Sequence, residues 1–296
     1  MTNPETPASK AIELPHLLAG RYELRRWIGA GGMGDVYAGI DVLLHRDVAV
    51  KLLRRADGGA ADVARFHAEA CALASLTSPY VVTIHDFGFA DEGLFVVMRH
   101  VEGRALDAVL ADEGALTVRR ALRVTSQVLA GLGELHAHGL VHGDVKPGNV
   151  IVDHGDRAVL IDLGVAADLR AGRGVGGGTP PYMAPEVAGG DADARADQYA
   201  AGILLVETLT GTAVSDRDDC ARRASALPAP LASIVLRAID LDPCERFASA
   251  RGMRDGLRAA GRTLRANGFD GGVALVVPRT PSPSRVTVRS RRSPPE

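Results

Sequence analysis

The side chains best suited to chemistry lie between residues 144 and 162. Asp144 and Lys146 are followed closely by Asn149, and Asp162 comes after two apolar runs. Carboxylate and amide oxygens are hard ligands that suit Mg²⁺, which keeps its remaining positions for water and substrate phosphates. A lysine beside them suits the same phosphates. This set predicts a site for magnesium and phosphate groups, and the alternative is an ordinary loop of solvated charges.

A hairpin would explain how the last of these residues returns to the others. The apolar runs 150–152 and 158–161 are separated by His154-Gly155-Asp156, which is a sensible hairpin connection. With the turn midway between the runs, Asn149 would lie opposite Asp162 at the open end of the hairpin.

A glycine cluster provides a second candidate phosphate site. Residues 29–36 match the pattern GxGxxGxV. Glycines let a backbone approach phosphates closely and present N–H groups that no side chain covers. A dinucleotide-binding fingerprint would require a helix next, whereas residues 36–40 have strand character. We therefore expect a strand–turn–strand lid over phosphates, and a plain glycine-rich hairpin is the alternative.

Two charged residues fall on apolar faces. Ala49 and Lys51 share one face of the strand predicted at 48–53, and Glu69 lies on the apolar stripe of the helix predicted at 61–76. Buried charges need partners, so pairing these two would satisfy both. Lys51, held by Glu69, could then bind phosphate oxygens. A lysine on an edge strand that faces solvent is the alternative.

The elements that must position these residues change in character along the chain. Strand-like runs up to residue 98 give way after residue 103 to helices at 106–112, 117–138, 196–210, 231–241 and 249–265. Asp197 is a candidate cap for the helix that it begins. Residues 1–20 are expected to form a flexible arm, and 267–296 a disordered basic tail rich in Pro, Ser and Arg.

The overall composition argues against several classes of protein. The formal net charge of −2 does not suggest a nucleic-acid or membrane surface. Cys71, Cys220 and Cys244 are odd in number and lack CxxC spacing, which argues against a disulfide framework or a zinc site. Neither a signal peptide nor an apolar run of about 18 residues is apparent. The sequence predicts a cytoplasmic protein.

In their order along the chain, these motifs resemble those of the eukaryotic-type protein kinases, and the bacterial serine/threonine kinases in particular. The resemblance extends from about residue 21 to residue 265. Its elements are GxGxxGxV, Ala-Val-Lys51, Glu69, His142-Gly-Asp144-x-Lys146-Pro-x-x-Asn149, Asp162-Leu-Gly164, Ala184-Pro-Glu186, Arg195-Ala-Asp197 and Asp242-Pro-Cys-Glu-Arg246.

The resemblance implies an α+β, bilobal kinase-like fold. A small β-rich lobe with one long helix would occupy 21–98, a hinge 99–104, and a larger, mainly helical lobe 105–266. It also implies a buried ion pair between Glu186 and Arg246.

The resemblance further implies transfer of the γ-phosphoryl group of MgATP to protein Ser or Thr hydroxyls, with ATP and protein substrates as partners. Asp144 and Lys146 would be catalytic, while Asn149 and Asp162 would hold Mg²⁺. The implied ATP-binding residues are Ile28, Gly29, Ala30, Gly31, Gly32, Met33, Gly34, Val36, Ala49, Lys51, Glu69, Met98, Arg99, Val101 and Ile151.

The sequence departs from the kinase pattern in two places. Gly143 replaces the arginine that many members use to receive an activation-segment phosphate, and residues 162–186 contain only two hydroxyls, Thr179 and Tyr182. Both hydroxyls are expected to be structural, so we predict a kinase that needs no phosphorylation there. The region after Gly211 is short, and its usual helix is expected to be reduced or absent. A nucleotide-binding scaffold and a small-molecule phosphotransferase are the rival functions.

Overall fold

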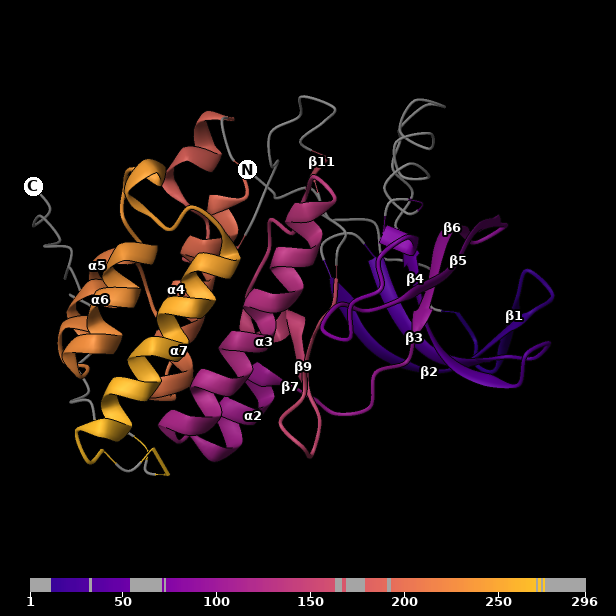
Figure 1. Ribbon diagram of the computed structural model, residues 1–296. Helices are drawn as coiled ribbons and strands as arrows, with labels where there is room; N and C mark the ends of the chain where they lie inside the picture. The colour runs from indigo at the N-terminus through magenta and orange to yellow at the C-terminus, as the bar shows by residue number, and fades with distance from the viewer. Residues whose placement is uncertain are drawn as a thin grey trace, which may run out of the picture.

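The computed structural model describes residues 12–31, 34–53, 71, 73–162, 167–168, 179–190, 193–269, 271–272 and 274. A curled antiparallel sheet and a mainly helical region lie side by side (Figure 1). This arrangement agrees with the predicted α+β, bilobal architecture. Most of the long helix predicted at 61–76 lies outside the described residues.

The smaller region is a six-stranded sheet in the order β1-β2-β3-β4-β6-β5. Residues 16–18, predicted as part of a flexible arm, instead pair with β2 as its edge strand, because Leu18 is fully buried there. The strands are β1 (His16–Leu18), β2 (Tyr22–Gly31), β3 (Gly34–Asp41), β4 (Arg46–Leu53), β5 (Ile84–Ala90) and β6 (Gly93–Arg99).

The two faces of this sheet bury different clusters, as the two-residue period of a strand requires. Val48, Val50 and Leu52 pack on the outer face in a small cluster of their own. Ala49 and Met98, which are direct cross-strand partners, face the other way and join the main core of the molecule. The inner face of the sheet is therefore the one turned toward the helical region.

The helical region begins after β6. A short strand leads into the first of six α-helices described in this region, and 3-10 turns and short strands connect the rest. Its elements are β7 (Arg104–Ala105), α2 (Leu106–Glu113), α3 (Val118–Ala137), β8 (Leu140–Val141), η1 (Pro147–Asn149), β9 (Val150–Val152), β10 (Ala158–Leu160), β11 (Ala167–Asp168), η3 (Pro185–Gly189), α4 (Arg195–Thr210), α5 (Arg217–Ser225), α6 (Ala229–Ala238), η4 (Pro243–Glu245) and α7 (Ala250–Ala266).

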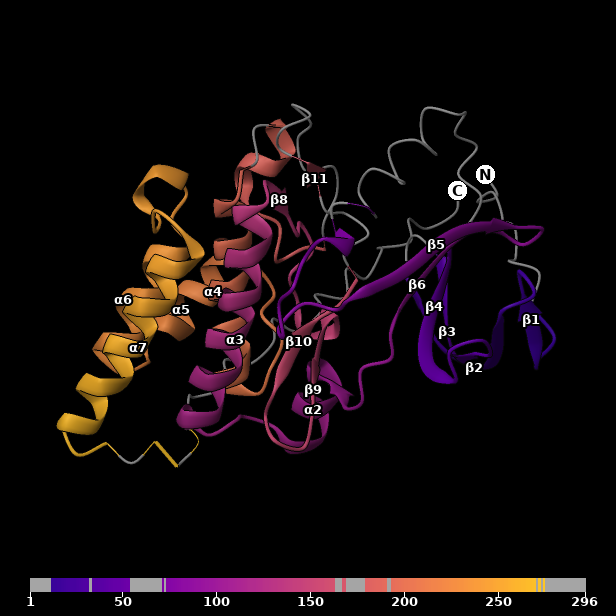
Figure 2. The ribbon, with the colours of Figure 1, turned by 45° about the vertical axis from the view of Figure 1, so that its right-hand side comes forward.

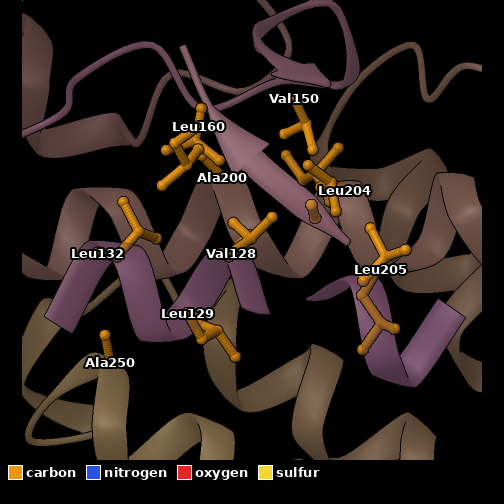
Figure 3. Close-up of a cluster of buried hydrophobic side chains, with 14 of the residues drawn as sticks. Val128, Leu129, Leu132, Val150, Leu160, Ala200, Leu204, Leu205 and Ala250 are labelled. Carbon is orange, nitrogen blue, oxygen red and sulfur yellow. The ribbon is translucent and has the colours of Figure 1, made fainter. Parts of the chain in front are cut away.

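The core of this region forms around α3 and α4. Helix α4 is buried on nearly every side, as its apolar sequence predicts. Figure 3 shows Val128 of α3 between Ala200 and Leu204 of α4, with Leu160 of β10 close by. Helix α7 also packs along α3 (Figure 2). The β9–β10 hairpin is thereby attached to the helical core.

The hairpin itself differs from its prediction by one residue. Its strands pair Val150 with Leu160 and Val152 with Ala158, so Asn149 lies opposite Ile161, whose N–H donates to the Asn149 carbonyl at 2.9 Å. The prediction that Asn149 faces Asp162 was therefore wrong by one position. The loop centres on Gly155, because the side chain of Asp153 accepts backbone N–H groups from Gly155 and Arg157.

The reduced or missing helix predicted after Gly211 was also wrong. Helix α5 is present, and Asp216 caps it by accepting the N–H of Asp219 at 2.8 Å. None of the helices described is long and apolar enough to cross a membrane.

Candidate active site

A side chain of α4 holds the loop that carries Asp144. Asp197, which is 1% exposed, accepts the backbone N–H groups of His142 and Gly143 at 2.9 Å each. His136 Nε2 of α3 lies 2.8 Å from the same carboxylate. The prediction that Asp197 caps its own helix was wrong, because the N-cap is Ala194 and no side chain caps there.

The charge on Asp197 is stabilised by these contacts. Burial alone would favour the neutral acid, but hydrogen bonds from His136 and Gly143 outweigh it and hold the pKa of Asp197 below its ordinary value. Gly143 adopts φ 77°, in the left-handed region that glycine occupies without strain. The loop before Asp144 is thus fixed by a buried anion from a rigid helix.

Three polar side chains contact Asp144 directly. Lys146 Nζ donates to Asp144 Oδ2 at 2.6 Å, and Asn149 Nδ2 donates to the same oxygen at 3.0 Å and to the Asp144 carbonyl at 2.8 Å. Thr179 Oγ1 donates to Asp144 Oδ1 at 2.8 Å while accepting from Lys146 Nζ at 2.6 Å. Sequence reasoning had expected Thr179 to be only structural, whereas its hydroxyl contacts both predicted catalytic residues.

This network keeps Asp144 ionised. Its side chain is largely buried, which favours the neutral acid, but donation from Lys146, Thr179 and Asn149 outweighs burial and lowers the pKa of Asp144. An ionised carboxylate within reach of a hydroxyl can accept that hydroxyl's proton or orient it. The arrangement is therefore chemically suited to activating an alcohol.

A second charged pair joins the sheet to the helical region. Lys51, which is buried on β4, forms an ion pair with Asp162, the residue that follows β10 by two positions. Asp162 adopts φ 60°, an uncommon backbone conformation for a non-glycine residue. Such strained conformations concentrate at functional sites. Glu69, the predicted partner of Lys51, lies outside the described residues, so that pairing stays a prediction.

The predicted nucleotide slot is partly assembled. Val36 and Lys51 are cross-strand partners on β3 and β4, beside the Ala49–Met98 pair, and Val36 packs against the same core as Ala49. Ile151 belongs to β9 in the helical region and is partly exposed. These residues line the inner face of the sheet and the hairpin opposite it.

The glycine cluster forms a β2–β3 hairpin, as its strand character predicts. Gly31 pairs with Gly34, Ala30 with Asp35 and Gly29 with Val36. A Cβ at Gly34 would lie 1.9 Å from the carbonyl oxygen of Leu52, so only glycine fits there. Ile28 lies at a bulge of β2 and is 38% exposed. Gly32 and Met33 lie outside the described residues.

The segment predicted as a hinge follows β6. The N–H of Arg99 donates to the Thr83 carbonyl at 2.9 Å, so this N–H already has a partner within the protein. Val101 packs against the main core. Arg99 is thus tied to the sheet, while Val101 contacts the main core.

The segment after Thr179 is tied to the helical core at two points. Arg246, fully buried, donates to both carboxylate oxygens of Glu186 at 2.6 and 2.8 Å, which confirms the predicted ion pair. Tyr182 donates to Glu207 of α4 at 2.7 Å. Burial raises the pKa of Glu207 despite donation from Val214 and Tyr182. Tyr182 thus has the structural role that the sequence predicted.

Sequence comparison with known proteins shows the family to which the chain belongs. The protein kinase domain family matches residues 22–240. The chain is 37% identical over 253 residues to the serine/threonine-protein kinase PknD of Mycobacterium tuberculosis, a match that covers 78% of this chain and 38% of the relative. It is 33% identical over 264 residues to PrkC of Bacillus subtilis, with 82% and 41% covered.

A third relative, the serine/threonine-protein kinase PksC of Streptomyces coelicolor, is 37% identical over 270 residues, with 81% of this chain and 49% of the relative covered. The chain belongs to the protein kinase domain family. It spans less than half the length of these three relatives.

Proposed function

We propose that the chain is a serine/threonine protein kinase that transfers the γ-phosphoryl group of MgATP to Ser or Thr hydroxyls of proteins. The observation that carries this proposal is the direct contact of Asp144 with Lys146 and Asn149. The similarity of the chain to relatives named as serine/threonine kinases supports Ser and Thr as the acceptor residues. The three scattered cysteines, which show no CxxC spacing, suit a reducing cytoplasm.

In this proposal, Asp144 accepts or orients the proton of the substrate hydroxyl, and Lys146 steadies the transferring phosphoryl group. Phosphoryl transfer proceeds through a loose transition state, so the protein mainly supplies position and charge. Lys146 donates to Asp144 and Thr179 at once, so its ammonium is already oriented beside the base. Little reorganisation is then needed when charge develops on the phosphate.

The residues present fit Mg²⁺. Asn149 uses its amide nitrogen on Asp144, which leaves the amide oxygen as a hard ligand, and Asp162 adds a carboxylate. No group of three or more His, Cys, Asp or Glu side chains that could hold a metal occurs in the described part of the chain. Mg²⁺ needs no such cage, because phosphates and water complete its coordination. When bound, the ion would neutralise phosphate charge.

The nucleotide would lie between the sheet and the β9–β10 hairpin. Val36, Ala49 and Met98 offer an apolar surface on one side, and Ile151 offers one on the other. Lys51 would turn from Asp162 to the α- and β-phosphates, with Glu69 as its proposed anchor. The β2–β3 hairpin would cover the phosphates through its glycines.

The test is transfer of label from γ-³²P-labelled ATP with Mg²⁺ to a generic protein acceptor. The wild type is compared with Asp144→Asn and with Asp112→Asn, an exposed control on α2. Label in the wild type and the control, but not in Asp144→Asn, is the expected result. No label in any of the three, with MgATP binding intact, would instead favour a nucleotide-binding scaffold. Label only on a small-molecule acceptor would favour the third candidate.

We also propose that this kinase needs no phosphate on its activation segment. Gly143 provides no guanidinium for such a phosphate, and the segment's two hydroxyls are engaged by Asp144 and Glu207. Enzyme treated with phosphatase should transfer label at the untreated initial rate and without a lag. A lag that disappears after preincubation with MgATP would contradict this.

A further inference from the structure

A groove of about 720 Å³ runs between α3 and α7, and none of the residues placed in the candidate active site lines it. The two helices lie side by side in Figures 1 and 2. Aliphatic side chains from both helices, with one ring from the segment before β5 and one from the segment after α7, form most of the lining outside the charged residues. These residues are Tyr80, Val118, Leu122, Leu257, Leu264 and Phe269.

The polar lining of this groove has one sign of charge. Six guanidinium groups contribute to it, and no Asp or Glu is among the residues that line it in the described part of the chain. Two of the arginines lie one turn apart on α3, and three lie at successive turns on α7. The six are Arg119, Arg123, Arg157, Arg258, Arg262 and Arg265.

This concentration of charge does not reflect the composition, because the whole chain carries a net charge of −2. Like charges at i,i+4 destabilise a helix. Among the described residues, neither Arg123, Arg262 nor Arg265 forms an ion pair, whereas Arg258 has Asp255 at 3.8 Å. The arginines thus oppose folding locally, and a bound anion would relieve that repulsion.

We propose that the groove binds an acidic segment of a partner protein. Carboxylates one helical turn apart would meet the guanidinium rim, and apolar side chains beside them would reach the aliphatic lining. The chain's own tail is a poor occupant, because residues 279–296 contain five arginines and one glutamate. The α7 side of the groove lies beyond residue 240, where the family match ends.

Two other polyanions fit the groove less well. A single-stranded nucleic acid gains much of its affinity from bases stacked on aromatic rings, whereas only two of the described residues that line the groove, Tyr80 and Phe269, are aromatic. An anionic membrane presents a broad surface of headgroups, whereas the apolar lining lies between two helices. Both polyanions are tested beside the peptide, in an experiment that does not depend on phosphotransfer.

The test is fluorescence anisotropy of the full chain with a labelled helical peptide that carries glutamates one turn apart and leucines on the neighbouring face. The variant combines Arg123→Gln, Arg262→Gln and Arg265→Gln. The control combines Arg25→Gln, Arg222→Gln and Arg251→Gln, exposed positions off the groove with the same change in charge. The groove variant should bind about tenfold more weakly or worse, and the control should match the wild type.

Binding in the wild type should also weaken as salt rises. A reversal of charge keeps the test decisive if the triple variant is unstable. Arg262→Glu should weaken binding of the acidic peptide and strengthen binding of the same peptide with lysines in place of its glutamates. Equal binding by wild type and groove variant would overturn the proposal. So would an oligonucleotide or an anionic vesicle that binds the groove more tightly than the peptide does.

Discussion

The hydroxyl of Thr179 lies between the two predicted catalytic side chains and contacts both. It donates to Asp144 and accepts from Lys146. Thr179→Ala should lower kcat by about ten- to a hundredfold, because it removes hydrogen bonds to two charged groups. Thr179→Ser keeps the hydroxyl and is the matched control, which should retain most of the activity. Equal losses in both variants would mean that the methyl group, and not the hydroxyl, is required.

Asp197 shows what residue types alone could not reveal. Its position at the start of an apolar helix suggested a cap, which is the common role for an aspartate there. Its actual partners, His142 and Gly143, lie more than fifty residues earlier in the chain. A local pattern cannot show that the helix start lies against a distant loop. Asp144, Lys146 and Asn149, in contrast, are close in sequence and could be grouped without the fold.

At the scale of elements, charges at both ends of α5 add to the burial of Cys220 and Ala224. Asp216 caps its first turn, Asp218 and Asp219 follow, and Arg222 and Arg223 occupy its last turn, an arrangement that complements the helix dipole. Asp216→Ala should cost about 1 kcal/mol and speed amide exchange across α5. Asp218→Ala, at an exposed neighbouring position, should cost less. Unchanged exchange in the Asp216 variant would show that packing alone holds α5.

The same element explains one failure of prediction. Apolar periodicity predicts α3 within one residue at each end, whereas the charged sequence of α5 carries little of that signal. The cap and the two charged turns were the signals that could have found it. Strand β1 was missed because three residues are too few for a period to show.

The turn that joins β3 to β4 has its own dependence on pH. Hydrogen bonds from Arg21 hold the pKa of Asp41 at about 2, against an ordinary value of 3.8, and the N–H groups of Leu43 and Leu44 add to this. A lowered folded pKa means that this stabilisation is full above the unfolded pKa and is lost as pH falls through the folded one.

The stability difference between wild type and Asp41→Asn should therefore shrink as pH falls from about 5 toward 2. Urea unfolding across this range measures it, with Asp91→Asn, in the exposed turn between β5 and β6, as the control. If the free energies of unfolding of the wild type and Asp41→Asn changed in parallel with pH, the expectation would be contradicted.

At the scale of the whole molecule, Lys51 and Asp162 connect the sheet to the helical region. If MgATP binds between them, it should stabilise the wild type by about 2.7 kcal/mol at one hundred times its Kd. Lys51→Met should abolish most of this gain, because the phosphates lose their buried cation. Thermal unfolding with and without MgATP measures the effect, and Arg25→Met at an exposed position of β2 is the control. If MgATP stabilised Lys51→Met as much as Arg25→Met, Lys51 would not be part of the nucleotide site.

The ion pair of Glu186 with Arg246 has a consequence for how this protein can be shortened. The family match ends at residue 240, six positions before the guanidinium that pairs with Glu186 and ahead of α7, which packs on α3. A chain trimmed to that stretch would keep an unpaired carboxylate and an uncovered apolar helix face, both of which invite aggregation. The boundary of the family match is therefore a poor place to end a shortened version of this protein.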